Sequence, residues 1–133
     1  MTLFVDTSTW SLLLRRDTPA ETPQTVRLLR AIEAGETILT TGLVFQELLH
    51  GFAGPRDRQR IIDRFSALPM LVPDRRDHID AAALRNACRA KGVQIGTIDA
   101  LLAYLCIRRG LTMLTSDGDF SRIASHSPLE LWA

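Results

Sequence analysis

Four acidic residues of this chain occupy positions that a parallel sheet would bring together: Asp6, Glu47, Asp99 and Asp117. Like charges at close range repel and raise one another's pKa, so four carboxylates are stable together only with a cation between them. Carboxylate oxygens are hard ligands, which suit Mg²⁺ or Mn²⁺. The sequence therefore predicts a metal site, and a site of this type favours phosphate chemistry.

Two of these carboxylates follow apolar runs that are typical of buried strands. Asp6 closes the run Leu3–Val5, and Asp117 comes shortly after the run Leu111–Thr115. Ligands of open parallel sheets bind beyond the C-terminal ends of the strands, which is where both aspartates are expected. An aspartate at such a place also caps the helix that follows it, so each one alone has a purely structural interpretation. Two together, each followed by small polar residues, favour a shared site.

The other acidic residues lie in stretches with a helical pattern. Glu47 is surrounded by apolar residues, so its carboxylate is either on the solvent side of a helix or held by a ligand. Asp99 is in a first helical turn, which the helix dipole favours, but the rest of that helix is apolar and implies burial. A buried carboxylate needs partners. Asp119 has three interpretations: a metal ligand, a cap for the next helix, or a group that orients a water.

The elements that must position these residues alternate between short apolar runs and helical patterns. Strands are expected at 3–6, 38–40, 70–72, 111–115 and 129–132, and helices at about 8–15, 23–35, 43–50, 61–68, 77–91, 98–109 and 119–124. Thr22 and Thr97 are the expected N-caps of their helices. This alternation predicts an α/β fold, with a mainly parallel central sheet in a three-layer α/β/α arrangement. At 133 residues, positions 1–133 are expected to form one domain.

Composition narrows the class of protein but does not name a partner. The chain is 46% hydrophobic and 23% charged with a net charge of +1, which is ordinary for a soluble globular protein. Fifteen of the sixteen basic residues are arginine, with one group at Arg56–Arg64. Such groups are either solvated helix faces or a surface for RNA or a partner. Trp10 is expected either in the core or at such a surface.

Features of membrane and secreted proteins are not expected in this sequence. No N-terminal stretch resembles a signal peptide, and no apolar run is long enough to cross a bilayer. Cys88 and Cys106 are expected to be buried free thiols, which fits a reducing compartment. We therefore expect a cytoplasmic protein without a membrane partner.

Two rival phosphate-binding classes lack their defining residues. A phosphoacceptor receiver domain needs a lysine after a late strand, but the single lysine, Lys91, is at a helix end. A dinucleotide-binding fold needs a glycine-rich turn after the first strand, where this chain has Asp6-Thr7-Ser8-Thr9. A P-loop is absent from the sequence too.

Four segments resemble the PIN domain and, among PIN proteins, the VapC toxins of bacterial toxin–antitoxin pairs. They are FVDTSTW at 4–10, TGLVFQELLHG at 41–51, TIDALLAYLC at 97–106 and MLTSDGDF at 113–120. Their order, spacing and total length agree with the family, so the resemblance covers essentially the whole chain. It implies a PIN-like nuclease domain.

The resemblance implies a function for the acidic residues. Asp6, Glu47, Asp99 and Asp117 would be the catalytic, metal-binding residues, with Asp119 also near the metal and the hydroxyls of Thr7, Thr115 and Ser116 as support. It implies an endoribonuclease that depends on Mg²⁺ or Mn²⁺, is a homodimer, and is inhibited by a cognate antitoxin. Either Glu47 or Asp99 would accept the proton of the attacking water. The alternatives are a PIN nuclease that acts in RNA processing or on DNA, and a non-catalytic module with a vestigial acidic pocket.

Overall fold

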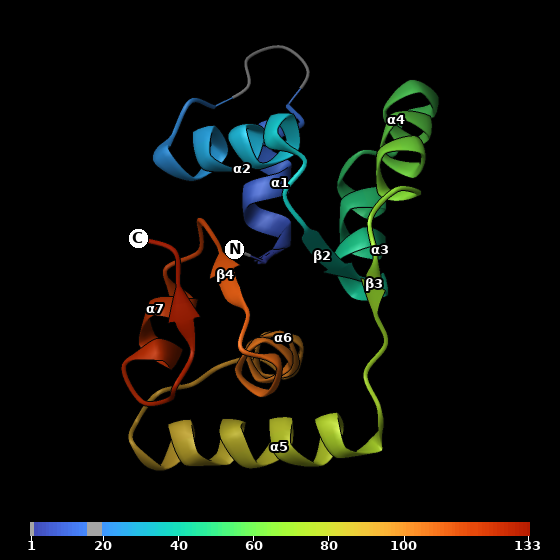
Figure 1. Ribbon diagram of the computed structural model, residues 1–133. Coiled ribbons are helices and arrows are strands. Elements are labelled where there is room, and N and C mark those ends of the chain that lie inside the picture. Colours follow the sequence, from blue (N-terminus) through green and yellow to red (C-terminus); the bar gives the residue numbers. More distant parts are fainter. Residues whose placement is uncertain (1, 16–19) are drawn as a thin grey trace.

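A computed structural model describes residues 2–15 and 20–133 and shows a parallel sheet with helices on both faces (Figure 1). The strands are β1 (Leu3–Val5), β2 (Ile38–Thr41), β3 (Met70–Leu71), β4 (Thr112–Leu114) and β5 (Glu130–Leu131). Their order in the sheet is β3-β2-β1-β4-β5, and every neighbouring pair is parallel. The predicted three-layer α/β/α class is confirmed.

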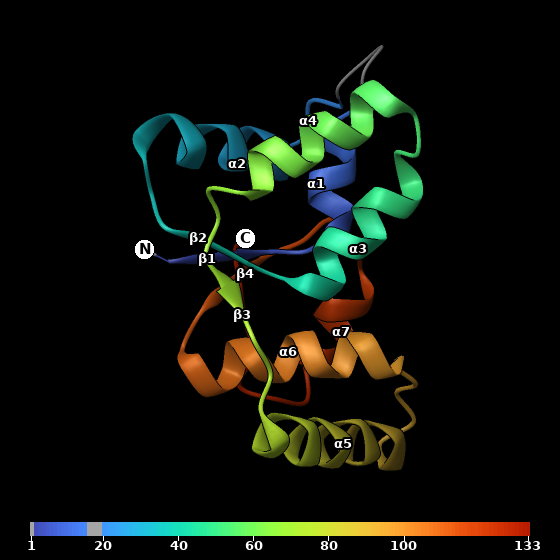
Figure 2. The same ribbon diagram turned by 90° about the vertical axis from the view of Figure 1, so that its right-hand side faces the viewer.

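The helices form the two outer layers (Figure 2). They are α1 (Thr7–Leu13), α2 (Pro23–Ala34), α3 (Gly42–Gly51), α4 (Pro55–Phe65), α5 (Arg75–Ala90), α6 (Thr97–Arg109) and α7 (Asp119–Ala124). Helices α1 to α4 lie on one side of the sheet, whereas α6 and α7 lie on the other and α5 packs outside α6. In the described part of the chain, no helix is both long and apolar enough to cross a membrane.

Local sequence signals explain where most helices begin and end. Thr22 caps α2 as predicted, with Pro23 in its first turn, and Gly35 ends that helix at a φ of 68° that favours glycine. Two expectations were wrong. Thr97 is the first residue of α6 and Gly96 is its N-cap, so no side chain caps this helix. Helix α4 begins at Pro55, well before the expected start, because proline suits a first helical turn even before an exposed polar stretch.

The core lies on both faces of the central strand. All three residues of β1 are fully buried, since helices cover the sheet on both sides. Trp10 is also fully buried, and its ring centroid is 5.0 Å from that of Phe65. Trp10 therefore belongs to the core and not to a binding surface. Cys88 and Cys106 are buried and free, as predicted.

The direction in which the chain builds the sheet changes beside β1. From β1 the chain proceeds to β2 and β3 on one side, and β4 and β5 then occupy the other side. Adjacent C-terminal strand ends at such a switch point leave a crevice where ligands of open α/β sheets bind. This switch point lies between the ends of β1 and β4, where the Asp6 backbone N–H donates to the Leu114 carbonyl at 3.3 Å.

Candidate metal centre

Asp6 lies at the switch point of the sheet, directly after β1. Its carboxylate is only 4% exposed and accepts hydrogen bonds from the hydroxyl of Thr115 at 2.7 Å and of Ser8 at 2.8 Å. It also caps α1 by accepting from the Thr9 backbone N–H. Burial raises the pKa of Asp6, and the hydrogen bonds from Thr115 and Ser8 oppose that rise. The structural and the functional interpretation of Asp6 are thus compatible.

Asp99, Asp117 and Asp119 form the tightest group of acids in the described part of the chain. One carboxylate oxygen from each lies within 4.8 Å of the others. Asp99 comes from the first turn of α6, Asp117 comes from the turn between β4 and α7, and Asp119 is the first residue of α7. Among the described residues, Arg122 is the one basic side chain that forms an ion pair with any of these three acids. It lies 3.2 Å from a carboxylate oxygen of Asp119, and both side chains are about half exposed.

The electrostatic interactions of Asp99 show that the other four predicted acids lie close enough to it to raise its pKa. Burial raises the pKa of Asp99 to about 6, and repulsion from the other four carboxylates adds to this rise, in the order Asp117, Asp119, Asp6 and Glu47. The charges of the group are therefore poorly compensated within the protein. A divalent cation at this place would remove the repulsion.

Glu47 lies at the edge of the centre. It is exposed on α3, and one of its carboxylate oxygens accepts from the Thr7 hydroxyl at 3.2 Å. It is not one of the three acids that lie within 4.8 Å of one another, and neither is Asp6. The structure thus brings three of the predicted residues into one tight group and holds the other two beside it by hydroxyl groups.

Hydroxyl groups connect the turn after β1 with the turn after β4. The Thr115 hydroxyl donates to Asp6 and accepts from the Asp117 backbone N–H at 3.0 Å. The Ser116 hydroxyl bonds to that of Thr9 at 2.9 Å and not to an acid. Ser8 was missed by the sequence reasoning, although it accepts from the Ser116 backbone N–H at 3.0 Å. A signal was present, because a hydroxyl two residues after a turn-forming aspartate commonly bonds back to it.

The structure narrows the interpretations of Asp119. The N-cap of α7 is Gly118 and Asp119 is its first residue, so the structure excludes the interpretation of Asp119 as the cap and leaves the other two. Its backbone N–H donates to the Asp117 carboxylate at 2.9 Å, which places the two acids side by side. Arg122, also missed from the sequence, donates to one carboxylate oxygen of Asp119 at 3.2 Å.

The donors of this centre fit a hard cation. They are carboxylate and hydroxyl oxygens that converge from strand ends and helix starts, and the tight group contains neither thiolate nor imidazole among the described residues. Such oxygen-only sets suit Mg²⁺ or Mn²⁺ and disfavour softer metals. The raised pKa of Asp99 agrees with a site whose charge a cation would balance.

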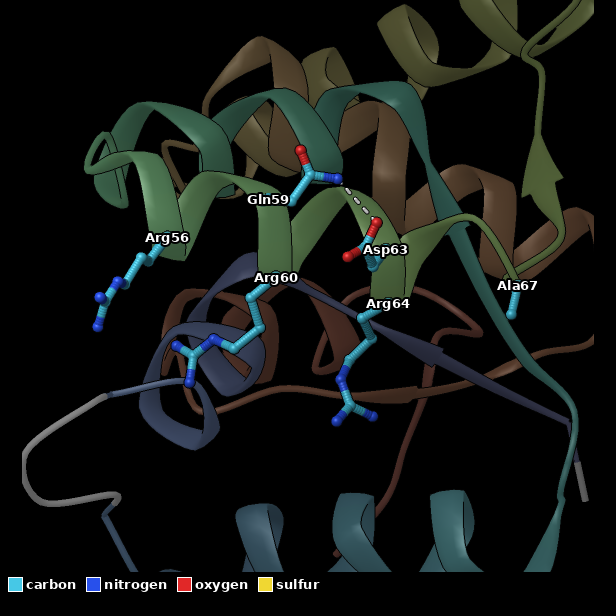
Figure 3. A pocket seen from close by; sticks show the side chains of 6 residues that line it. All are labelled: Arg56, Gln59, Arg60, Asp63, Arg64 and Ala67. Carbon is cyan, nitrogen blue, oxygen red and sulfur yellow. Dashed lines mark hydrogen bonds between the residues drawn. The ribbon is translucent and has the colours of Figure 1, made fainter.

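A second feature is a row of arginines on α4. Arg56, Arg60 and Arg64 recur every four residues and therefore lie on one face of the helix, where they line a hollow of about 750 Å³ together with Gln59, Asp63 and Ala67. Figure 3 shows the side chains of Arg56, Arg60 and Arg64 extending from the same side of α4. The Arg60 guanidinium donates to the Leu14 backbone carbonyl at the end of α1. The arginine face of α4 therefore has two parts: Arg60 contacts the end of α1, and the face as a whole lines a hollow on the surface.

Known proteins match this chain over nearly its whole length. The family model described as PIN domain matches residues 3–125. The structure of VapBC2 from Rickettsia felis bound to a DNA fragment from their promoter is 22% identical, with a TM-score of 0.76, and the match covers 99% of this chain and 98% of that chain. FitAcB from Neisseria gonorrhoeae is 18% identical, with a TM-score of 0.71 and 98% and 96% coverage. VapC20 from Mycobacterium tuberculosis, described as a sarcin-ricin loop cleaving toxin, is 19% identical, with a TM-score of 0.67 and 96% and 98% coverage.

Proposed function

This chain belongs to the PIN domain family, and from that premise we propose that it is a metal-dependent endoribonuclease, the toxin of a toxin–antitoxin pair. The observation that carries the proposal is the group of Asp99, Asp117 and Asp119 at the switch point of the sheet, with Asp6 and Glu47 beside it. The similarity of the fold to VapC20, whose description is that of an RNA-cleaving toxin, supports RNA as the substrate class.

In the proposed mechanism, Asp99, Asp117 and Asp119 would hold Mg²⁺ or Mn²⁺, and Asp6 and Glu47 would complete the site. When bound, the cation polarises the phosphate and lowers the pKa of a water, so that a nucleophile forms at neutral pH. The hydroxyls of Ser8 and Thr115 donate to Asp6 and would hold its carboxylate in place beside the cation.

The two candidate bases differ in their surroundings. Glu47 is exposed, lies outside the tight group and is oriented by Thr7, which leaves it free to accept a proton while the other acids hold the cation. Asp99 lies inside the group, where a bound cation would hold its carboxylate. We therefore favour Glu47 as the proton acceptor.

The test of this function is metal-dependent RNA cleavage. The purified protein is expected to cut single-stranded RNA in Mg²⁺ or Mn²⁺ and to stop in EDTA, because the carboxylates alone cannot stabilise the phosphate charge. Readdition of excess Mn²⁺ should restore cleavage. The variant Asp6→Asn, purified in the same way, controls for contaminating ribonuclease. Cleavage at an equal rate in EDTA, or by the Asp6→Asn protein, would contradict the proposal.

We further propose that the protein is a homodimer that pairs through the edge strand β3. Met70 and Val72 are 42% and 81% exposed there, and together with Leu43 and Leu71 they line an apolar hollow of about 390 Å³. Exposed apolar edge strands tend to be covered by another chain. A cognate antitoxin that covers the acidic centre is the second proposed partner, in line with the VapBC complexes that share this fold.

The variant Val72→Asp is expected to shift the dimer to monomers. A carboxylate in an apolar interface should weaken association by about 100-fold or more, which light scattering at micromolar protein would detect as a halved mass. The matched control is Ile79→Asp, because Ile79 is an exposed apolar residue on α5. If Ile79→Asp rather than Val72→Asp dissociates the dimer, the interface lies on α5 and the β3 proposal is wrong.

A further inference from the structure

A second hollow, of about 450 Å³, adjoins the acidic centre at the C-terminal ends of β4 and β5. It shares the turn of residues 115–118, including Asp117, with the centre. Its other walls come from α1, the start of α2, α7 and the end of β5: Leu12, Thr22, Gln24, Ser121, Leu131 and Trp132. Its size is in the range of small-molecule sites, roughly 300–1,000 Å³.

The chemistry of this hollow differs from that of the acidic centre. Apart from Asp117, the described residues that line it have uncharged side chains. A hollow whose described lining has no basic side chain is a poor place for a phosphate group. Its apolar and aromatic walls, Leu12, Leu131 and Trp132, suit a flat and largely apolar group. The amide of Gln24 and the hydroxyls of Thr22 and Ser121 supply donors and acceptors at its rim.

We propose that this hollow binds the base and ribose of a nucleotide that flanks the phosphate cut at the acidic centre. The inference rests on the proposed nuclease function and adds a base-recognition subsite to it. The indole of Trp132 provides the surface on which a base stacks, as aromatic side chains do in proteins that bind single-stranded RNA. Gln24 donates to and accepts from the edge of the base, which makes it the residue that selects among the four bases.

Continuity with the acidic centre supports this assignment. Asp117 belongs to both places, since one of its carboxylate oxygens lies within 4.8 Å of one from Asp99 and the residue also lines the hollow. A nucleoside in the hollow therefore presents its attached phosphate toward the three acids. The hollow also lies along the strand ends, where open parallel sheets bind their ligands.

The test uses the four neutral ribonucleosides as probes of the metal-free protein in EDTA. Adenosine, cytidine, guanosine and uridine are titrated, and the two tryptophan indole N–H signals are followed by NMR. At least one nucleoside is expected to shift the signal of Trp132 and to leave that of Trp10 in place, because Trp10 is fully buried in the core. The variant Trp132→Phe assigns the signals and should keep binding, since a phenyl ring also stacks.

Two substitutions separate stacking from base selection. Trp132→Ala is expected to weaken binding by about 10-fold or more, with circular dichroism as the check of folding. Gln24→Ala should weaken the preferred nucleoside by roughly 3- to 10-fold and reduce discrimination among bases. Gln59→Ala is the matched control, because Gln59 lies on α4 and its amide donates to Asp63. In Mg²⁺, Gln24→Ala should also broaden the base preference at the cut site.

Several outcomes would overturn the proposal. One is that no nucleoside shifts the Trp132 signal at concentrations on the order of 10 mM, because even a site with a weak, millimolar dissociation constant would be mostly occupied there. Another is that Gln24→Ala and Gln59→Ala behave alike. A third is that purified antitoxin shifts the Trp132 signal while nucleosides do not. Cleavage without nucleoside binding would remove only the subsite. Nucleoside binding without cleavage would overturn the nuclease function and, with it, the role of the hollow beside a cut phosphate, and would leave only a nucleoside-binding site.

Discussion

Replacement of Asp99 by asparagine is expected to lower the rate constant of RNA cleavage by about 10³-fold or more. The change removes one of the three carboxylates that lie within 4.8 Å of one another, and with it a large part of the charge that would hold a divalent cation. Loss of several kcal/mol of charge stabilisation corresponds to a rate factor of this size. The measurement is single-turnover cleavage of a labelled RNA, with Mn²⁺ binding followed by calorimetry. Asp63→Asn, on the exposed face of α4, is the matched control and should cleave normally.

The same substitution should stabilise the metal-free protein, which separates a functional role from a structural one. The pKa of Asp99 is raised from 3.8 to about 6, so its contribution to stability is greatest below pH 4 and is lost as the pH rises through 6. Asparagine does not titrate. At pH 7.5 Asp99→Asn should therefore raise the free energy of unfolding by roughly 1–2 kcal/mol, after discounting for partial exposure to solvent. A destabilised variant, or one that cleaves within tenfold of the parent, would show that Asp99 has another role.

Replacement of Asp77 by alanine is expected to cause the largest loss of stability among charge substitutions in this chain, about 3 kcal/mol. Asp77 is fully buried in the first turn of α5 and accepts from Arg109 at 3.0 Å and from Arg108 at 3.0 Å. Its removal leaves two guanidinium groups without their shared anion. Because those side chains are 38% and 26% exposed, they can turn to water, which limits the loss. Urea unfolding at pH 7 would measure the effect.

The pH dependence of this cluster has the opposite sign to that of Asp99. The hydrogen bond from Arg109 is the main cause that holds the pKa of Asp77 far below its usual range, against the effect of burial. Asp77 therefore stabilises the fold above pH 4, and this contribution is lost as the pH falls through its folded-state pKa. The control is Asp57→Ala, which breaks only a partly exposed pair with Arg60 at 3.7 Å and should cost under ~1 kcal/mol. Equal losses in the two variants would contradict the assigned role of Asp77.

The two ends of α6 have different proposed roles, metal binding at the first turn and stability at the last. Asp99 lies in its first turn, whereas Arg108 and Arg109 lie in its last turn and hold α5 through Asp77. A helix of this length spans roughly 15–20 Å, so a change at one end need not disturb the other. Below its unfolding temperature, the Asp77→Ala protein should thus retain RNA cleavage. Its loss in a folded variant would show that the two ends of α6 are coupled.

The sequence predicts the fold well because its signals are local. Buried runs such as Leu3–Val5 read as strands of a parallel sheet, and Gly35 and Gly110 stop their helices with positive φ. The acidic residues follow from the same logic, since the rule that places ligands at strand ends needs only the order of the elements. Glu47 and Asp99 were also candidates from the residues alone, but their positions inside helices are weaker signals, and the resemblance to the family motifs then gave them the same role.

What the sequence does not predict depends on side chains that meet only in the folded protein. The tight group around Asp99 could not be told from the wider set, because Asp6 is held by Ser8 and Thr115 and Glu47 by Thr7. The cluster around Asp77 was also missed, because it depends on the packing of α5 on α6, which no spacing rule encodes. Arginines in a last helical turn look the same in sequence whether they are solvated or paired.

The hydroxyl contacts between the two turns have a consequence for the order in which the protein is made. Asp6 and Thr115 are 109 residues apart in the chain, yet they share one of the shortest hydrogen bonds of the centre. A ribosome must therefore synthesise the chain at least through Thr115 before the two turns can meet, because β4 has to pair with β1 first. Nascent chains that stop before β4 lack these contacts, so an RNA-cutting activity built on the centre would arise only after β4 has been made.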